Sequence, residues 1–247
     1  MWRRDDGVIA PNRDLNWGAL VVAATKALDP AVAKNLLAWG AGRLDVTTEN
    51  GTEPCRIPDL RPVRWLGYLQ ADATVEYRDV ASLAIRIETL IITVHQQTLR
   101  PPREITLGLA YYLRSLADAL PSGAPATSAE MRGSVIFAAE CAGCHSPPGL
   151  AGAPVPLEVV GTDPVLGLSA DRGTGTYRVP SLHGVASRGP LFHDGRARDL
   201  AAVLDPSRVA PDYDGALHRA GPVSGHPFGL ELTSGDRADL LAYLELL

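Results

Sequence analysis

Cysteine and long apolar runs are both scarce in this sequence, and each shortage argues against a class of protein. Three cysteines among 247 residues are too few for a zinc site with four thiolate ligands. No stretch approaches the roughly 18 consecutive apolar residues of a transmembrane helix. The net charge is −5 and the basic residues form no run, so nothing indicates a nucleic-acid partner.

Two of the three cysteines belong to the run Cys141-Ala142-Gly143-Cys144-His145, which has the Cys-x-x-Cys-His spacing of a c-type haem attachment site. Two thiols one helical turn apart can each form a thioether with a haem vinyl group, and the adjacent imidazole then binds the iron. The motif predicts one haem c per chain, held covalently by Cys141 and Cys144. It also predicts His145 as the proximal iron ligand.

Two other interpretations of these cysteines have less support in the sequence. A structural zinc site needs four Cys or His ligands, commonly in two close pairs, and the remaining cysteine, Cys55, stands alone beside Pro54. A thioredoxin-like dithiol follows a strand in a βαβ unit, whereas this motif follows a helical segment. Haem attachment is therefore the leading interpretation.

Local signals predict two helices around the motif. Thr127 and Glu130 have the spacing of a capping box, which predicts a helix from there to about Glu140. A second cap at residues 233–236 precedes an apolar stripe that runs to the C-terminus. Gly133 and Phe137 share one face of the first helix, and Tyr243 of the second is their expected neighbour.

The segment from about Thr127 to Leu247 resembles a cytochrome c domain, whose first and last helices cross at such a contact. The runs at residues 177–182, 189–195 and 225–229 further resemble the C-terminal domain of the di-haem cytochrome c peroxidase and MauG family. The resemblance implies an all-α fold. Residues 146–176 and 205–230, which are rich in Gly and Pro, are expected to be loops around the cofactor without regular elements.

The first half is interpreted as a second copy of the same design that lacks a haem motif. Arg56-Ile57-Pro58 matches Arg178-Val179-Pro180, and residues 112–116 match residues 243–247. We therefore expect two tandem cytochrome c-like domains: a degenerate or truncated one at 1–121, a linker at 122–127 and the haem-binding one at 128–247. Coincidental similarity between two helical domains is the alternative.

The distal iron ligand has several candidates in the sequence. Met1 is terminal, and Met131 lies about 15 Å from Cys141 along the same predicted helix. The family resemblance implies a distal methionine near Ser207, where this chain has none. His226 is the preferred candidate, followed by His218, His193 and His183, each of which has a hydrogen-bonded loop residue as its alternative interpretation.

Two functions are compatible with these features. In the first, the chain is an electron carrier that exchanges single electrons with a redox partner protein or a small donor or acceptor. In the second, it is part of a di-haem peroxidase-like enzyme that reduces hydrogen peroxide. Covalent haem attachment implies a periplasmic or other extracytoplasmic location, yet no signal peptide follows Met1. We expect a longer precursor that supplies a signal peptide and a first haem motif; loss of that haem is the rival expectation.

Overall fold

The computed structural model describes residues 2–3, 9–10, 16–24, 28–45, 54–93, 99–119 and 123–247. Within them the chain is mainly helical, and its strands form two-stranded pairs of two or three residues per strand. The prediction of an all-α fold is confirmed. Two compact units are present: unit 1 comprises residues 1–58, 156–177 and 186–237, and unit 2 comprises residues 59–155, 178–185 and 238–247. The predicted division into domains at residues 122–127 stays a prediction, and residue 122 lies outside the described residues.

Unit 1 contains short elements joined by long connections. Its helices are α1 (Trp17–Ala24), α2 (Pro30–Ala38), α6 (Leu157–Val160), α7 (Val165–Leu168) and α8 (Leu200–Leu204), with a 3-10 turn, η5, at Pro206–Val209. Its strands are β1 (Trp2–Arg3), which pairs with β2 (Ile9–Ala10), and β3 (Arg43–Asp45), which pairs with β4 (Pro54–Arg56). Strand β8 (Thr176–Tyr177) pairs with β7 (Val155–Pro156), and the 3-10 turn η4 lies at Val185–Ser187.

The expectation that residues 146–176 and 205–230 lack regular elements was wrong in detail. Helices α6 and α7, strand β8 and turn η5 all lie there. Pro156 and Pro164 precede the two helices, and a proline is favourable where a helix begins because its missing N–H has no helical partner there. Gly161 then ends α6 with a φ of 65°, a left-handed conformation that glycine adopts without a steric penalty.

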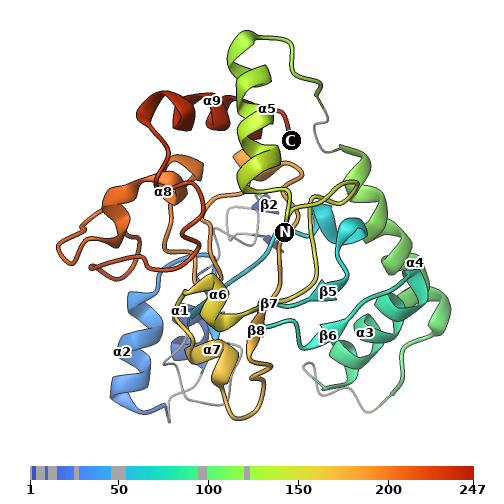
Figure 1. The fold of residues 1–247 in the computed structure, drawn as a ribbon. Coiled ribbons are helices and arrows are strands. Elements are labelled where there is room, and N and C mark those ends of the chain that lie inside the picture. The colour runs from blue at the N-terminus through green and yellow to red at the C-terminus, as the bar shows by residue number, and fades with distance from the viewer. Residues whose placement is uncertain are drawn as a thin grey trace. The chain divides into compact units, whose positions relative to one another are not determined.

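Unit 2 is built from longer helices. It contains α3 (Val80–Thr93), α4 (Arg103–Ser115), α5 (Ser128–Glu140), the C-terminal part of α9 (Ser234–Leu244) and the 3-10 turns η2 (Arg61–Trp65) and η3 (Leu116–Ala119). Strands β5 (Tyr68–Leu69) and β6 (Val75–Glu76) pair antiparallel. Helices α3 and α4 lie side by side (Figure 1). Residues of both helices and of the segment 63–77 form the core of this unit: Val63, Leu66, Tyr77, Leu83, Ala84 and Ala110.

Helix boundaries in unit 2 follow the local signals in the sequence. The side chain of Thr127 accepts from the backbone N–H of Glu130, and the Glu130 carboxylate accepts from the N–H of Thr127, so the capping box is formed and α5 ends at Glu140 as predicted. Asp79 caps α3 by accepting from the N–H of Ser82 at 2.8 Å. Such caps satisfy backbone donors that have no partner in the first helical turn.

Helices α5 and α9 cross at Gly133 (Figure 1). A Cβ atom added to Gly133 would lie 2.0 Å from the carbonyl oxygen of Asp239, so only glycine permits this approach. One turn further along α5, the rings of Phe137 and Tyr243 are 5.3 Å apart. The predicted contact among Gly133, Phe137 and Tyr243 is therefore present, and it fixes the helix that leads to Cys141.

Candidate functional site

The Cys-x-x-Cys-His run forms a turn at the C-terminal end of α5. The backbone N–H of Cys141 donates to the carbonyl of Phe137 at 2.9 Å, which continues the helical hydrogen bonding to that point. The N–H groups of Cys144 and His145 then both donate to the carbonyl of Cys141, at 3.1 and 2.9 Å. One turn of backbone thus carries both thiols and the imidazole, as the sequence spacing predicted.

His145 is buried, and its ring is oriented by a backbone contact. The Nδ1 atom lies 3.0 Å from the carbonyl oxygen of Leu150. A carbonyl can only accept, so Nδ1 carries the proton and the neutral ring has its lone pair on Nε2. This is the usual arrangement of a metal-binding histidine, because the second ring nitrogen fixes the tautomer and the ring direction.

The loop that supplies this carbonyl is itself held in place. Leu150 has a φ of 48°, a left-handed conformation that non-glycine residues adopt only when their surroundings hold them there. Its carbonyl also accepts from the N–H of Leu182 at 3.1 Å, and the hydroxyl of Ser181 donates to the carbonyl of Gly149 at 2.7 Å. The acceptor for His145 is therefore rigidly positioned.

The thiol of Cys141 is not activated. Burial raises the pKa of Cys141 to about 11, and Glu140 and Cys144 contribute in the same direction. Redox dithiols have lowered pKa values, often at a helix N-terminus, whereas Cys141 lies at the C-terminal end of α5. This argues against the thioredoxin-like alternative and fits a cysteine whose partner is a haem vinyl group.

The four candidate distal histidines lie in both units. In unit 2, the Nε2 of His183 donates to the carbonyl of Pro148 at 2.8 Å, and its ring lies 5.2 Å from that of Trp65. In unit 1, the Nε2 of His218 donates to the carbonyl of Asp194 at 3.2 Å, and His193 stacks on Tyr177 with ring centroids 4.8 Å apart.

His226, also in unit 1, has aromatic neighbours. Its ring meets those of Phe192 and Phe228 edge-on, at centroid distances of 6.3 and 5.4 Å. Its backbone N–H donates to the carbonyl of Val160 at 2.6 Å. Met131, by contrast, is half exposed on α5.

Burial shifts the titration of two of the histidines. It lowers the pKa of His218 to about 4, with Arg43 contributing in the same direction, and it also lowers the pKa of His193. Both rings are therefore neutral at pH 7.

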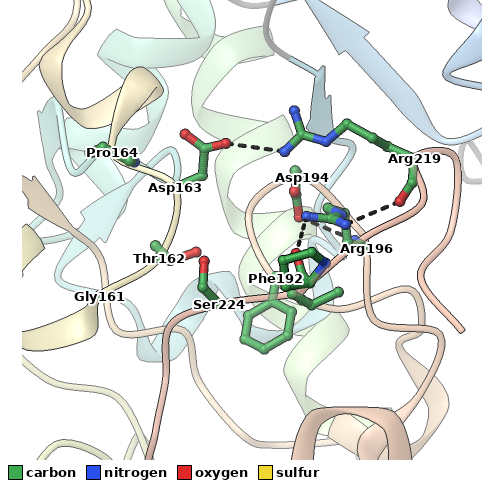
Figure 2. Close-up of a pocket in the computed structure, with 11 residues that line it drawn as sticks. Gly161, Thr162, Asp163, Pro164, Phe192, Asp194, Arg196, Arg219 and Ser224 are labelled. Carbon is green, nitrogen blue, oxygen red and sulfur yellow. Dashed lines mark hydrogen bonds and ion pairs between the residues drawn. The ribbon is translucent and has the colours of Figure 1, made fainter. Parts of the chain in front are cut away.

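Unit 1 also contains a pocket of about 340 Å³ beside Phe192 (Figure 2). Asp163 and Arg219 form an ion pair of 3.2 Å at its edge, and Asp194 and the buried Arg196 line it as well. Two carboxylates and two guanidinium groups thus balance the charge of its wall.

Several features of the site were not foreseen from the sequence. These are the Leu150 carbonyl as partner of His145, the Ser181 contact that holds its loop, and Arg208, which is buried in η5. A backbone carbonyl has no sequence signature, so no local pattern identifies Leu150. Among the described residues, no three His, Cys, Asp or Glu side chains are grouped so that they could hold a metal ion by themselves.

Comparison with known proteins agrees with this arrangement. The cytochrome c family model matches residues 130–247, which include most of α5, the Cys-x-x-Cys-His run and α9. No curated protein matches the chain. Residues 130–247 therefore match a cytochrome c domain, and the Cys and His donors within them fit a covalently attached haem c.

A solved structure places the fold more narrowly. The chain is similar to a MauG-like protein associated with microbial copper homeostasis, with a TM-score of 0.56 and 22% sequence identity over 84% of this chain and 78% of that one. The chain thus shares the fold of a MauG-like protein, as the resemblance of the runs at residues 177–182, 189–195 and 225–229 predicted.

Proposed function

We propose that this chain is a c-type cytochrome that binds one haem c and exchanges single electrons with a redox partner. The observation that carries the proposal is the geometry of His145, whose Nδ1 donates to the Leu150 carbonyl at the end of a helix that also bears Cys141 and Cys144. The haem supplies reversible one-electron chemistry. The partner is a redox protein or a small electron donor or acceptor.

The residues of the chain have three tasks in this proposal. Cys141 and Cys144 provide two covalent anchors, so the group stays bound in either oxidation state. The Nδ1 hydrogen bond of His145 fixes the ring direction and raises the basicity of Nε2, and such bonds are one means of tuning a haem potential. The crossing of α5 and α9 at Gly133 holds the attachment turn in place.

His226 is the proposed distal iron ligand. Two rival histidines, His183 and His218, use Nε2 to donate to backbone carbonyls, and His193 lies stacked on Tyr177. Histidine in place of methionine generally lowers the potential of a c-type haem. The protein should therefore have a lower potential than a cytochrome with His and Met ligands.

We further propose a periplasmic or other extracytoplasmic location, and two tandem cytochrome c-like domains divided at residues 122–127. Covalent haem attachment requires export in bacteria. None of the helices in the described part of the chain has the length and apolarity needed to span a membrane.

The intact mass of the protein isolated from its native host tests the haem number. A mass equal to the chain plus one haem would support the one-haem carrier. A polypeptide with no covalently added mass would refute the proposal. A heavier polypeptide with two haems would transfer support to the second candidate function.

The second candidate is a role as part of a di-haem cytochrome c peroxidase-like enzyme that reduces hydrogen peroxide. Its support is the fold shared with a MauG-like protein across most of both chains. An open iron position and a second haem would distinguish this enzyme from the carrier. Consumption of hydrogen peroxide with an added electron donor would favour the enzyme, and a six-coordinate haem inert to peroxide would favour the carrier.

A further inference from the structure

A buried arginine, Arg208, contacts the segment that carries His226. Its hydrogen bonds go to backbone carbonyls and not to an acidic side chain. Arg208 in η5 is 0% exposed. Its guanidinium donates to the carbonyls of Val203 at 2.7 Å, of Gly225 at 2.8 Å and of His226 at 2.8 Å, and also to the carbonyl of Val223. Burying a guanidinium costs free energy unless its N–H donors are satisfied. The N–H donors of Arg208 have four backbone carbonyls as acceptors.

Three of the four acceptor carbonyls belong to one short segment, Val223–His226. The last two residues of this segment have positive φ angles. Gly225 has a φ of 85° and His226 a φ of 47°. A Cβ atom on Gly225 would lie 2.4 Å from the backbone of Thr162. A histidine in the left-handed region costs free energy and persists only where other contacts hold it, and Arg208 supplies those contacts.

The same arginine reaches the ring environment of His226 through Phe192. The guanidinium carbon of Arg208 lies 5.2 Å from the centre of the Phe192 ring, within the range of a cation–π interaction. The ring of Phe192 in turn meets the imidazole of His226 edge-on. Arg208 thus touches the backbone of His226 directly and its side chain through one aromatic ring.

We propose that Arg208 is the positioning residue for the His226 imidazole. The guanidinium locks the segment Val223–His226 in its left-handed turn and holds Phe192 against the ring, so that His226 has one orientation. The inference rests on the proposed role of His226 as distal ligand, but the orientation itself belongs to unit 1 and can be measured separately.

The test compares two arginine variants of the haem-loaded protein. Arg208→Lys keeps the charge but replaces the fork of donors by one nitrogen, which cannot serve four carbonyls. Arg196→Lys is the matched control, because Arg196 is also buried and also donates to several carbonyls, those of Pro222, Arg219 and Gly221. None of these carbonyls lies in the segment Val223–His226.

The first readout is the rate at which carbon monoxide binds the reduced protein, which rises when a distal ligand is loosely held. Losing even one hydrogen bond to a charged group corresponds to roughly a tenfold change, so Arg208→Lys should bind carbon monoxide at least about tenfold faster. Arg196→Lys should stay within about twofold of the parent. If His226→Ala alters the haem spectrum, so that His226 does bind the iron, equal rates in the two variants would overturn the proposal.

The second readout is the nuclear magnetic resonance signal of the His226 ring in the reduced, low-spin protein. Arg208→Lys should shift or broaden it, and Arg196→Lys should leave it unchanged. If His226→Ala leaves the haem spectrum intact, the distal role fails, and this signal still decides the role of Arg208. An unshifted His226 signal in Arg208→Lys would overturn it.

A milder variant covers the case in which Arg208→Lys does not fold. Phe192→Leu removes the shared ring and keeps the four carbonyl contacts. It should shift the His226 signal in the same direction by a smaller amount. No change in that signal would refute the contact through Phe192 and with it the proposal.

Discussion

The crossing of α5 and α9 leads to a quantitative prediction for Gly133→Ala. The new Cβ atom would lie 2.0 Å from the Asp239 carbonyl oxygen and 2.8 Å from the Tyr243 Cβ atom. Ordinary contact begins at 3.4 Å, so the two helix backbones must separate by roughly 1.4 Å at this point. The obstacle is backbone, which no side-chain rotation relieves.

The expected free-energy change combines two opposite effects. Overpacking of a tight contact costs up to about 3 kcal/mol, and replacing a helical glycine by alanine returns about 1 kcal/mol. Gly133→Ala should therefore lower the free energy of unfolding by about 2 kcal/mol. The separation would also disturb the Phe137–Tyr243 contact and the Arg132–Asp239 ion pair.

A second glycine supplies the control for this experiment. Gly108 lies in the middle of α4 and is exposed, with no atom within 4 Å of an added Cβ atom. Gly108→Ala should raise the free energy of unfolding by about 1 kcal/mol through helix propensity alone. Guanidinium unfolding of the haem-loaded proteins, followed by circular dichroism, measures both. If Gly133→Ala were as stable as Gly108→Ala, the close approach of α5 and α9 would be refuted.

The remaining predictions concern the haem ligands and the response to pH. His145→Ala should abolish the native low-spin haem spectrum, and a normal spectrum would exclude His145 as the proximal ligand. Cys141→Ser should leave a single thioether or none, which mass spectrometry of the denatured protein detects as haem lost from the chain. His226→Ala should convert the haem to a five-coordinate or solvent-ligated form, and a sulfur-to-iron charge-transfer band in the parent protein would contradict histidine ligation. The pKa of His218 is lowered from 6.5 to about 4 in the folded state. As the pH drops from 6.5 to 4, the unfolded chain therefore binds a proton at His218 that the folded protein does not bind. The free energy of unfolding should fall over this pH range. His218→Gln should weaken that dependence in urea titrations, and an unchanged pH profile would show that His218 is not buried as described.

Helix boundaries were predictable because their signals are local. The capping box at Thr127 and Glu130 acts within four residues, so the sequence alone locates the start of α5. The crossing at Gly133 was also predictable, since a missing side chain next to an aromatic on the same face indicates a close helix contact.

Other contacts depended on backbone carbonyls, which give no signal in the sequence. Arg208 was not identified from the sequence, because its acceptors are backbone carbonyls 5 to 18 residues away. The Leu150 carbonyl that orients His145 was missed for the same reason, since every residue carries an identical carbonyl. The short helices α6 and α7 were missed because they are single turns without periodicity.

The sequence by itself predicted the chemistry of this protein: the spacing of Cys141, Cys144 and His145 indicates covalent haem attachment, because it places two thiols and an imidazole on one turn. The tertiary structure alone decided how the imidazoles are held. Left-handed turns at Leu150 and His226, a buried guanidinium and the backbone carbonyls of loops fix their orientation. Such constraints arise only when separate segments fold together, so they leave no pattern along the chain.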